Sequence, residues 1–341
     1  MRLPLRRAPR LRLLVLAVSD RCDQRCAHCA IWRGDAVGRP ELTLAERLAV
    51  VEEAIAAGVE SALQTGGEPL LSSDLWPIAA RFQGAGVRLL LATNGMLLAR
   101  HASAVGRVFS EVYVSLDGGS PVTHDGIRGV ASWERLRAGI GALRADAPRV
   151  RRVARCTLQA ANLGELEGVI GQARSAGFDA VSFLPLDASS DAFGADAPAR
   201  RALLPSEGAI EAFEAEVDRL ERSGGLDRGF VLEDAAKLRR IARHLRGSAG
   251  AGAFERPDCD APRWSMVVEA DGGVRPCFFH AEVGHAGQGL RAVRASAAYA
   301  SALRTIEEPN RTCDRCVCPK SGAPSRAAAG GVSGLIQRVI G

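Results

Sequence analysis

From residue 11 to about residue 186 the chain alternates short apolar runs with amphipathic stretches of helical period. The apolar runs are rich in branched side chains and carry few charges, as strands buried on both faces do. Six strands are predicted, at residues 12–19, 61–65, 88–93, 111–116, 151–159 and 180–186. Helices are predicted between them, at residues 44–57, 73–83, 102–109, 132–145 and 162–176.

Strands that alternate with helices predict an α/β fold with a parallel sheet and right-handed crossovers. Six such units fall short of a closed eight-stranded barrel. We therefore expect a partial (β/α)6 TIM-like barrel, with a doubly wound open sheet as the alternative. In both architectures ligands bind at the carboxyl ends of the strands.

The rest of the chain divides by composition. Residues 1–10 are a basic arm, and residues 11–200 would form the barrel. A bridging segment at 201–255 has helical patterns at 206–221 and 234–245. Residues 256–320 are rich in turns and hold five of the nine cysteines, as expected of a small α+β domain with an inorganic core. Residues 321–341 form an Ala- and Gly-rich tail, which we expect to be flexible.

The charge and hydropathy of the sequence limit the partners and the cellular compartment that can be expected. The 44 basic and 39 acidic side chains are too balanced to predict nucleic-acid binding, and no apolar run is long enough to span a membrane. Residues 1–17 resemble a signal peptide, but the apolar run leads into a cysteine cluster with no small-residue cleavage site between them. An odd number of cysteines, nine, favours metal or cluster ligation over disulfides. We expect a cytoplasmic protein.

Three of the cysteines directly follow the first predicted strand. Cys22, Cys26 and Cys29 lie within eight residues. Three thiolates can bind three corners of an iron-sulfur cubane and leave the fourth iron open to a small molecule. The alternatives are zinc, with His28 as fourth ligand, and chance clustering. Zinc sites usually combine ligand pairs from two separate segments, which favours the cluster.

The spacing Cys22-x3-Cys26-x2-Cys29 after an N-terminal strand resembles the signature of the radical S-adenosylmethionine (SAM) superfamily. The resemblance implies that a [4Fe-4S] cluster binds SAM at its open iron and breaks a carbon-sulfur bond by one-electron reduction. The products are methionine and a 5'-deoxyadenosyl radical, which takes hydrogen from the substrate. Family members often place an aromatic residue before the third cysteine, near the adenine, and His28 occupies that position here.

A glycine motif closes the second predicted strand. Gly66, Gly67, Glu68 and Pro69 match the family motif for the SAM amino group. Glycines permit close backbone approach, so that main-chain carbonyls and the Glu68 carboxylate would receive the ammonium.

Polar residues also end the third and fourth predicted strands. Asn94 follows the third, and Ser115 and Asp117 end the fourth, ahead of His124-Asp125 and Arg128-Gly129. This string resembles the corresponding segment of radical SAM enzymes with C-terminal cluster domains, which implies that Ser115 and Asp117 face SAM or substrate. Asn162, after the fifth strand, could also face SAM or substrate, or it could serve as a helix N-cap. The alternative for all of them is turn-forming residues that cap strands.

Five further cysteines lie near the C-terminus. Between Cys259 and Cys277 the sequence Asp271-Gly272-Gly273 predicts a hairpin, and Cys313 and Cys316 form a close pair. The pattern Cys-x12-Gly-x4-Cys resembles the twitch domain, a short form of the SPASM domain that carries an auxiliary [4Fe-4S] cluster. Cys318 would be a spare ligand or would replace or compete with Cys316. Zinc is the alternative at this site.

The ninth cysteine, Cys156, is predicted to be a buried core thiol in the fifth strand.

The expected function is that of a SAM-dependent dehydrogenase or maturase that uses an auxiliary [4Fe-4S] cluster. An alternative is a peptide maturase that forms thioether or carbon-carbon links; only 21 residues precede Cys22, which disfavours a precursor-binding domain there. A non-enzymatic iron-sulfur electron-transfer protein fits the barrel motifs less well. The expected partners are a small-molecule or peptide substrate and an electron donor such as flavodoxin or ferredoxin. The sequence identifies no general base.

Overall fold

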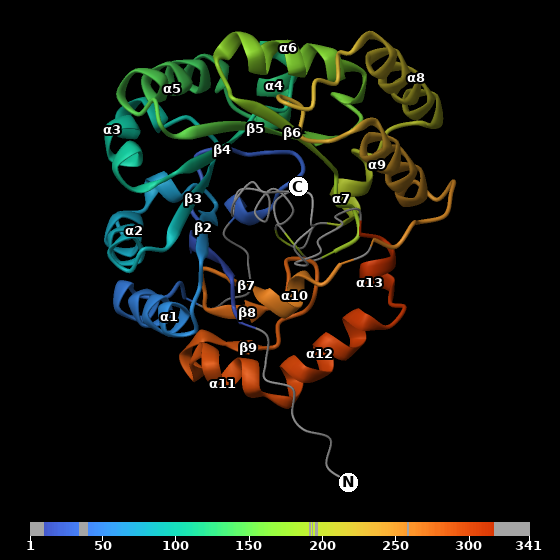
Figure 1. The fold of residues 1–341 in the computed structure, drawn as a ribbon. Coiled ribbons are helices and arrows are strands. Elements are labelled where there is room, and N and C mark those ends of the chain that lie inside the picture. Colours follow the sequence, from blue (N-terminus) through green and yellow to red (C-terminus); the bar gives the residue numbers. More distant parts are fainter. Residues whose placement is uncertain are drawn as a thin grey trace.

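A nine-stranded sheet organises the computed structural model, which describes residues 10–33, 40–190, 192, 194, 197–257 and 259–316. The strand order is β6-β5-β4-β3-β2-β1-β7-β8-β9, parallel from β6 to β7 and antiparallel at β8 and β9. The strands are β1 (Leu13–Ser19), β2 (Ser61–Gly66), β3 (Arg88–Thr93), β4 (Glu111–Ser115), β5 (Arg151–Leu158), β6 (Ala180–Pro185), β7 (Ser265–Val268), β8 (Gly273–Arg275) and β9 (Gly284–His285). The sheet curves but does not close (Figure 1).

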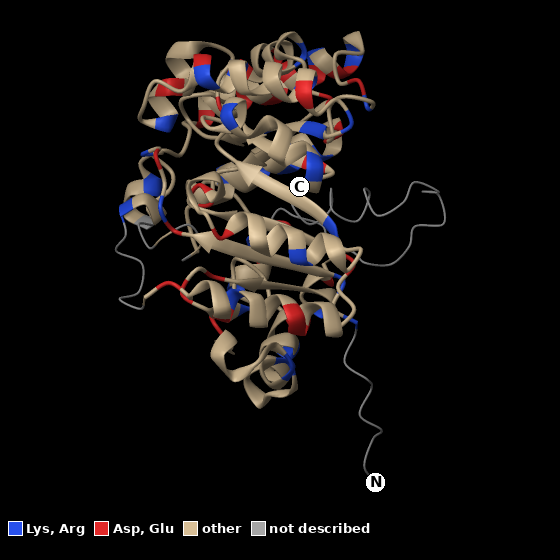
Figure 2. Cartoon of the chain, turned by 90° about the vertical axis from the view of Figure 1, so that its left-hand side faces the viewer, with Lys and Arg blue, Asp and Glu red and all other residues tan. Residues whose placement is uncertain are grey.

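Helices surround the curved sheet, most of them on its outside (Figure 1). In chain order they are α1 (Leu44–Ala56), α2 (Leu75–Gly84), α3 (Leu98–Val108), α4 (Pro121–Arg128), α5 (Trp133–Asp146), α6 (Leu166–Ala176), α7 (Ala197–Arg201), α8 (Glu207–Ser223), α9 (Ala235–Ser248), α10 (Ala261–Trp264), α11 (Leu290–Ala295), α12 (Ala297–Glu307) and α13 (Arg311–Asp314). Charged residues of both signs lie mainly on the helices and loops, and the strands carry few (Figure 2).

Each strand of the parallel sheet buries both faces, which explains its continuous apolar sequence. Leu13, Val15 and Leu63 contribute to an apolar cluster inside the curve, and their neighbours Leu14 and Leu16 pack in the larger cluster with the helices. The period of two along a strand divides one run of apolar residues between two cores.

The partial (β/α)6 barrel predicted from the sequence is confirmed, and all six predicted strands are present with ends that differ by at most one residue. Three helix predictions need correction. The helix expected at 102–109 spans Leu98–Val108. The helix expected at 162–176 begins at Leu166, because the Asn162 side chain bonds to the strand ends beside it and does not cap a helix. The helix α4 was not expected, because its polar composition is typical of a turn.

The C-terminal cysteine-rich segment continues the barrel sheet. β7 pairs in parallel with β1, from Leu13 with Ser265 to Leu16 with Val268. The predicted hairpin is present: Gly272 has φ of +89° and the Asp271 carboxylate accepts from Gly273 N at 2.9 Å. The expected arm at 1–10, apart from residue 10, the tail at 321–341 and Cys318 lie outside the described residues. Within the described part of the chain no helix is long and apolar enough to cross a membrane.

Candidate functional site

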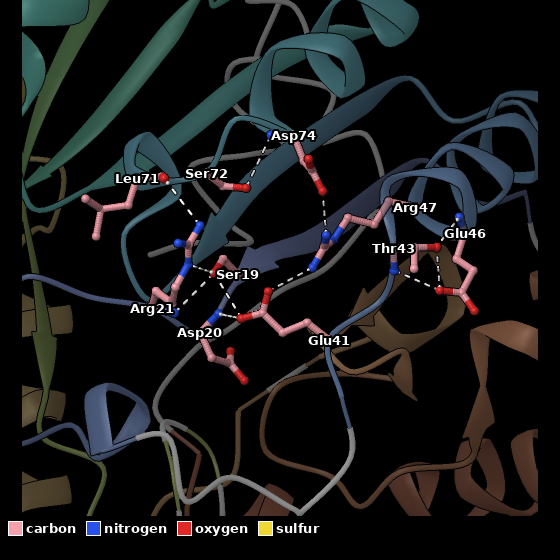
Figure 3. A network of polar contacts seen from close by, with 10 residues as sticks. All are labelled: Ser19, Asp20, Arg21, Glu41, Thr43, Glu46, Arg47, Leu71, Ser72 and Asp74. Carbon is pink, nitrogen blue, oxygen red and sulfur yellow. Dashed lines mark hydrogen bonds and ion pairs between the residues drawn. The ribbon is translucent and has the colours of Figure 1, made fainter.

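The loop that carries the first three cysteines is fixed where it leaves β1 (Figure 3). Glu41 accepts hydrogen bonds from Ser19 Oγ at 3.0 Å and from Asp20 N at 2.8 Å. The buried Arg47 of α1 pairs with Glu41 at 3.1 Å and with Asp74 at 2.7 Å. The start of the loop is therefore tied to the segments that precede α1 and α2.

The glycine motif lies directly against this loop. Gly67 N donates to Ser19 O at 2.7 Å and Glu68 N donates to Arg21 O at 2.8 Å. A Cβ atom would lie 2.2 Å from Ser19 O if placed on Gly66 and 2.4 Å from Arg21 O if placed on Gly67. Glycine is required at both positions because the two backbones approach so closely.

Glu68 is fully buried and faces the protein rather than the cavity. Its carboxylate accepts from Leu70 N at 3.0 Å, Thr93 Oγ1 at 2.8 Å and Asn94 N at 2.7 Å. Burial raises the pKa of Glu68 to about 7, against the lowering effect of these three donors. Its structural role is to join the ends of β2 and β3. Pro69, likewise buried, begins a short 3-10 helix at Pro69–Leu71.

A cavity of about 320 Å³ opens at the carboxyl ends of β1 to β6. Several of the predicted site residues line it together, among them Cys22, Cys26, His28, Cys29, Gly66, Gly67, Asn94, Ser115 and Cys316. Its lining also includes residues that sequence analysis did not single out, such as Gln24, Trp32, Arg155, Thr157, Phe278 and Arg315. Glu68, Pro69 and Asp117 are not part of the lining.

The three thiols of the loop face one volume. Burial raises the pKa of Cys22 to about 12 and that of Cys29 to about 11, so that metal ligation at these positions must release protons. Within the described residues no three Cys, His, Asp or Glu side chains converge as the ligands of a single ion do. A cubane binds each cysteine at a different iron, so its ligands need only border one space. Three thiols on one cavity wall fit that requirement.

His28 and Asn94 border the cavity as neutral groups. Burial lowers the pKa of His28 to about 4, and its Nδ1 lies 3.4 Å from Gln159 Nε2. The Asn94 amide donates to Asp23 Oδ1 at 2.6 Å, and its oxygen accepts from Met96 N at 2.9 Å. Asn94 therefore braces the cysteine loop from the end of β3.

Asp117 is fully buried and forms an ion pair. Its Oδ2 lies 2.7 Å from Arg128 NH2, and its Oδ1 accepts from Thr157 N at 2.7 Å. Asp117 N donates to His124 Nδ1 at 3.2 Å, and Asp117 O accepts from the Asn162 amide at 2.9 Å. The side chains and backbone at Asp117 are thus bound by other parts of the protein, as in the strand-capping alternative.

The sequence analysis missed the contribution of Arg128. This arginine lines the cavity and donates through NH1 to Cys26 Sγ at 3.3 Å. Only its place in the polar string that runs from Ser115 to Gly129 marked Arg128 in the sequence. Its contact with Cys26 could not be seen there, because the two residues are 102 positions apart. The structure also confirms Cys156 as a core thiol, with no exposed surface.

The C-terminal cysteines come from segments that the fold brings together. Cys259 packs against the inner apolar cluster, and Cys277 follows β8. His280 Nε2 lies 3.2 Å from Cys313 Sγ, and Cys316 N donates to Cys313 O at 3.0 Å. Contacts of Arg256 with Asp314, at 3.0 Å, and with the Ile306 carbonyl, at 2.6 Å, hold the segment before Cys259 against α13.

The fold and the cavity define an α/β-barrel protein with a cysteine-lined cavity at the carboxyl ends of its strands. Residues 16–152, from β1 to β5, match the family model described as the radical SAM superfamily. This match agrees with the resemblance that the cysteine spacing indicated.

Two curated relatives illustrate the range of the similarity. The chain is 36% identical over 141 residues to an AdoMet-dependent heme synthase of Methanosarcina barkeri, covering 40% of this chain and 40% of that protein. It is 32% identical over 173 residues to a GTP 3',8-cyclase of Caulobacter vibrioides, covering 49% of each. The matched region thus spans half or less of the length of these relatives.

Solved structures share the fold over more of the chain. Streptococcus suis SuiB bound to the precursor peptide SuiA aligns with a TM-score of 0.66 at 13% identity, over 91% of this chain and 72% of that one. The structure of anSMEcpe with bound AdoMet aligns with a TM-score of 0.64 at 17% identity, over 89% of this chain and 86% of that one. At these identities the likeness concerns the fold.

Proposed function

We propose that the protein is a radical SAM enzyme that removes a hydrogen atom from a substrate bound in the cavity. Cys22, Cys26 and Cys29 would hold a [4Fe-4S] cluster, with SAM beside Gly66 and Gly67. When bound, this pair supplies a 5'-deoxyadenosyl radical by one-electron cleavage of SAM. The observation that carries the proposal is that the three cysteines, the glycine turn and the neutral His28 line one cavity.

The chain's own residues would prepare this site. Gly66 and Gly67 bring the end of β2 against the cysteine loop. Asn94 braces that loop from the end of β3, and Arg128 braces it from the end of α4. The neutral His28 ring offers a flat surface suited to adenine. The role of Glu68 in this proposal is to hold the turn, because its carboxylate is already bound by three donors.

The second cysteine group supports an oxidative reaction. Cys316 lines the same cavity as the first three cysteines. Cys259, Cys277, Cys313 and Cys316 would hold an auxiliary [4Fe-4S] cluster, to which a substrate radical could pass an electron; Cys318 is the further candidate ligand. Dehydrogenation is therefore the favoured reaction, with flavodoxin or ferredoxin as the proposed source of the reducing electron.

The cavity also bears on the class of substrate. The cavity of about 320 Å³ would hold SAM as well as the substrate, and ligand pockets of drug size start at roughly 300 Å³. A compact small-molecule substrate is therefore favoured. The second candidate is a peptide maturase acting on one inserted side chain, which is supported by the shared fold with peptide-bound SuiB. The relatives are named for heme synthesis and for GTP cyclisation, which are different reactions. They support radical SAM chemistry for this protein but favour no particular substrate.

SAM cleavage tests the proposal. We expect the anaerobically reconstituted, dithionite-reduced protein to convert SAM to 5'-deoxyadenosine and methionine, measured by liquid chromatography. Cys26→Ala should abolish the conversion, because it removes one cluster ligand. Cys156→Ala is the matched control, since that thiol is a core residue, and should retain it. Turnover that survives Cys26→Ala would refute the cluster assignment.

A further inference from the structure

Arg128 places a positive charge at one of the three cysteines of the loop. Residue Arg128 is 7% exposed, and residue Cys26 is 6% exposed. NH1 donates to Cys26 Sγ at 3.3 Å, while NH2 pairs with the fully buried Asp117 at 2.7 Å. Because Asp117 also accepts from Thr157 N, the guanidinium is held between a fixed carboxylate and the sulfur.

Backbone hydrogen bonds hold Arg128 and Cys26 in position for their contact. Arg25 N donates to Arg128 O and Ala27 N donates to Ile127 O, each at 3.0 Å, so the two residues that flank Cys26 are bonded to the end of α4. The helix ends at Gly129 with φ of +70°, and a Cβ atom there would lie 2.4 Å from Arg25 O. The end of α4 and the cysteine loop thus form one rigid unit around Cys26.

The loop cysteines differ in their surroundings. Cys22 Sγ is approached by neutral donors, Gln24 N at 3.5 Å and the Asn94 amide at 4.0 Å. Cys26 Sγ is approached by a charged one. Charge-assisted hydrogen bonds are roughly twice as strong as neutral ones. Buried charges are also little screened by solvent.

We propose that Arg128 is a positioning residue that raises the reduction potential of the cluster held by Cys22, Cys26 and Cys29. One-electron reduction adds negative charge to the cluster, and a buried cation that donates to a ligand sulfur stabilises the reduced form. Asp117 acts in the opposite direction, since its negative charge offsets that of Arg128. The inference rests on the proposed function, because it requires a cluster at these cysteines.

A redox titration of the reconstituted full-length protein, followed by electron paramagnetic resonance, tests the effect. Arg128→Met should lower the equilibrium constant for one-electron reduction at least tenfold, which is a fall of about 59 mV. Arg25→Met is the matched control, because it removes the same charge from the same loop at an exposed position, where solvent screens it. Arg25→Met should leave the potential near the wild-type value.

The direction in which a third variant shifts the reduction potential distinguishes an electrostatic effect of Arg128 from a general disturbance of the cysteine loop. Asp117→Asn should raise the potential, because it leaves Arg128 uncompensated, whereas general damage to the site would shift both variants alike. If Arg128→Met fails to fold, the neutral pair Asp117→Asn/Arg128→Gln replaces it and should show a lower potential than Asp117→Asn. Iron content is measured for every variant.

An Arg128→Met protein with full iron content and a wild-type potential would overturn the inference. So would shifts of the same sign in Arg128→Met and Asp117→Asn. A wild-type protein in which no [4Fe-4S] signal depends on Cys26 would instead remove the proposed function. The two failures are therefore distinguishable.

Discussion

His124 shows how one buried side chain depends on its protonation state. It has no exposed surface, and its Nδ1 accepts from Asp117 N at 3.2 Å, which requires a neutral ring. Burial, and next the charge of Arg128, lower the pKa of His124 from 6.5 to about 4. The neutral ring therefore contributes stability that is complete above pH 6.5 and is lost as the pH falls through 4.

We expect His124→Asn to flatten the acid limb of the stability profile. The asparagine oxygen can accept the same bond and does not titrate, whereas the shift of His124 makes the wild type about 3 kcal/mol less stable at pH 4 than at pH 7. Urea unfolding across this range measures the slope. His101→Asn serves as control, because His101 is partly exposed and should change the slope little. Parallel slopes for wild type and His124→Asn would show that folding does not lower the pKa of His124.

Residue identities in the site were readable from the sequence, but the directions of the side chains were not. The glycine turn, the loop cysteines and Ser115 line the cavity. Glu68 does not, because three donors from two strand ends compete for its carboxylate, and no local pattern reveals them. The contact between Arg128 and Cys26 depends on pairing of segments 102 residues apart, which spacing in the sequence does not encode.

At the scale of elements, the turn after β2 and the loop after β1 hold each other in place. We expect Gly67→Ala to destabilise the protein by about 2 kcal/mol, since the new Cβ would meet Arg21 O at 2.4 Å and push the loop away. Iron incorporation should fall with it. Urea unfolding and iron analysis of the purified variant measure both effects.

The matched control for this substitution is Gly141→Ala in α5. A Cβ atom on Gly141 meets nothing within 4 Å, and alanine favours a helix interior by about 1 kcal/mol over glycine. This variant should therefore gain stability and keep its iron. A Gly67→Ala protein as stable as the wild type would mean that the two backbones are less tightly apposed than the structure has them.

Elements with a clear period were predictable, and those built by tertiary contacts were not. The capping box of Thr43 and Glu46 marks the start of α1 in the sequence and is present in the fold. α4 is short, and its Asp125 carboxylate caps α5 through Ser132 N and Trp133 N, both at 2.9 Å. Such a helix is stabilised by its neighbours rather than by its own pattern.

At the scale of the whole molecule, the number of iron-sulfur clusters per chain tests whether the second cysteine group holds a cluster. We expect about eight irons per chain, two cubanes, and about four in Cys259→Ala/Cys277→Ala, because the first site is left intact. Iron and zinc are measured together by mass spectrometry. About four irons and one zinc in the wild type would assign the second site to structural zinc and remove the proposed electron acceptor.

Because β1 pairs with β7, its place in the sheet is complete only after β7, a strand far along the chain, has been synthesised. During synthesis β1 can pair with β2 early, yet its other edge stays unpaired until residues 265–268 have emerged from the ribosome. An open edge of apolar sequence is a template for association with other chains. The strand that leads into the loop cysteines is thus exposed to misassembly in the nascent protein, and a cluster delivered before the C-terminal hairpin docks would meet an incomplete sheet.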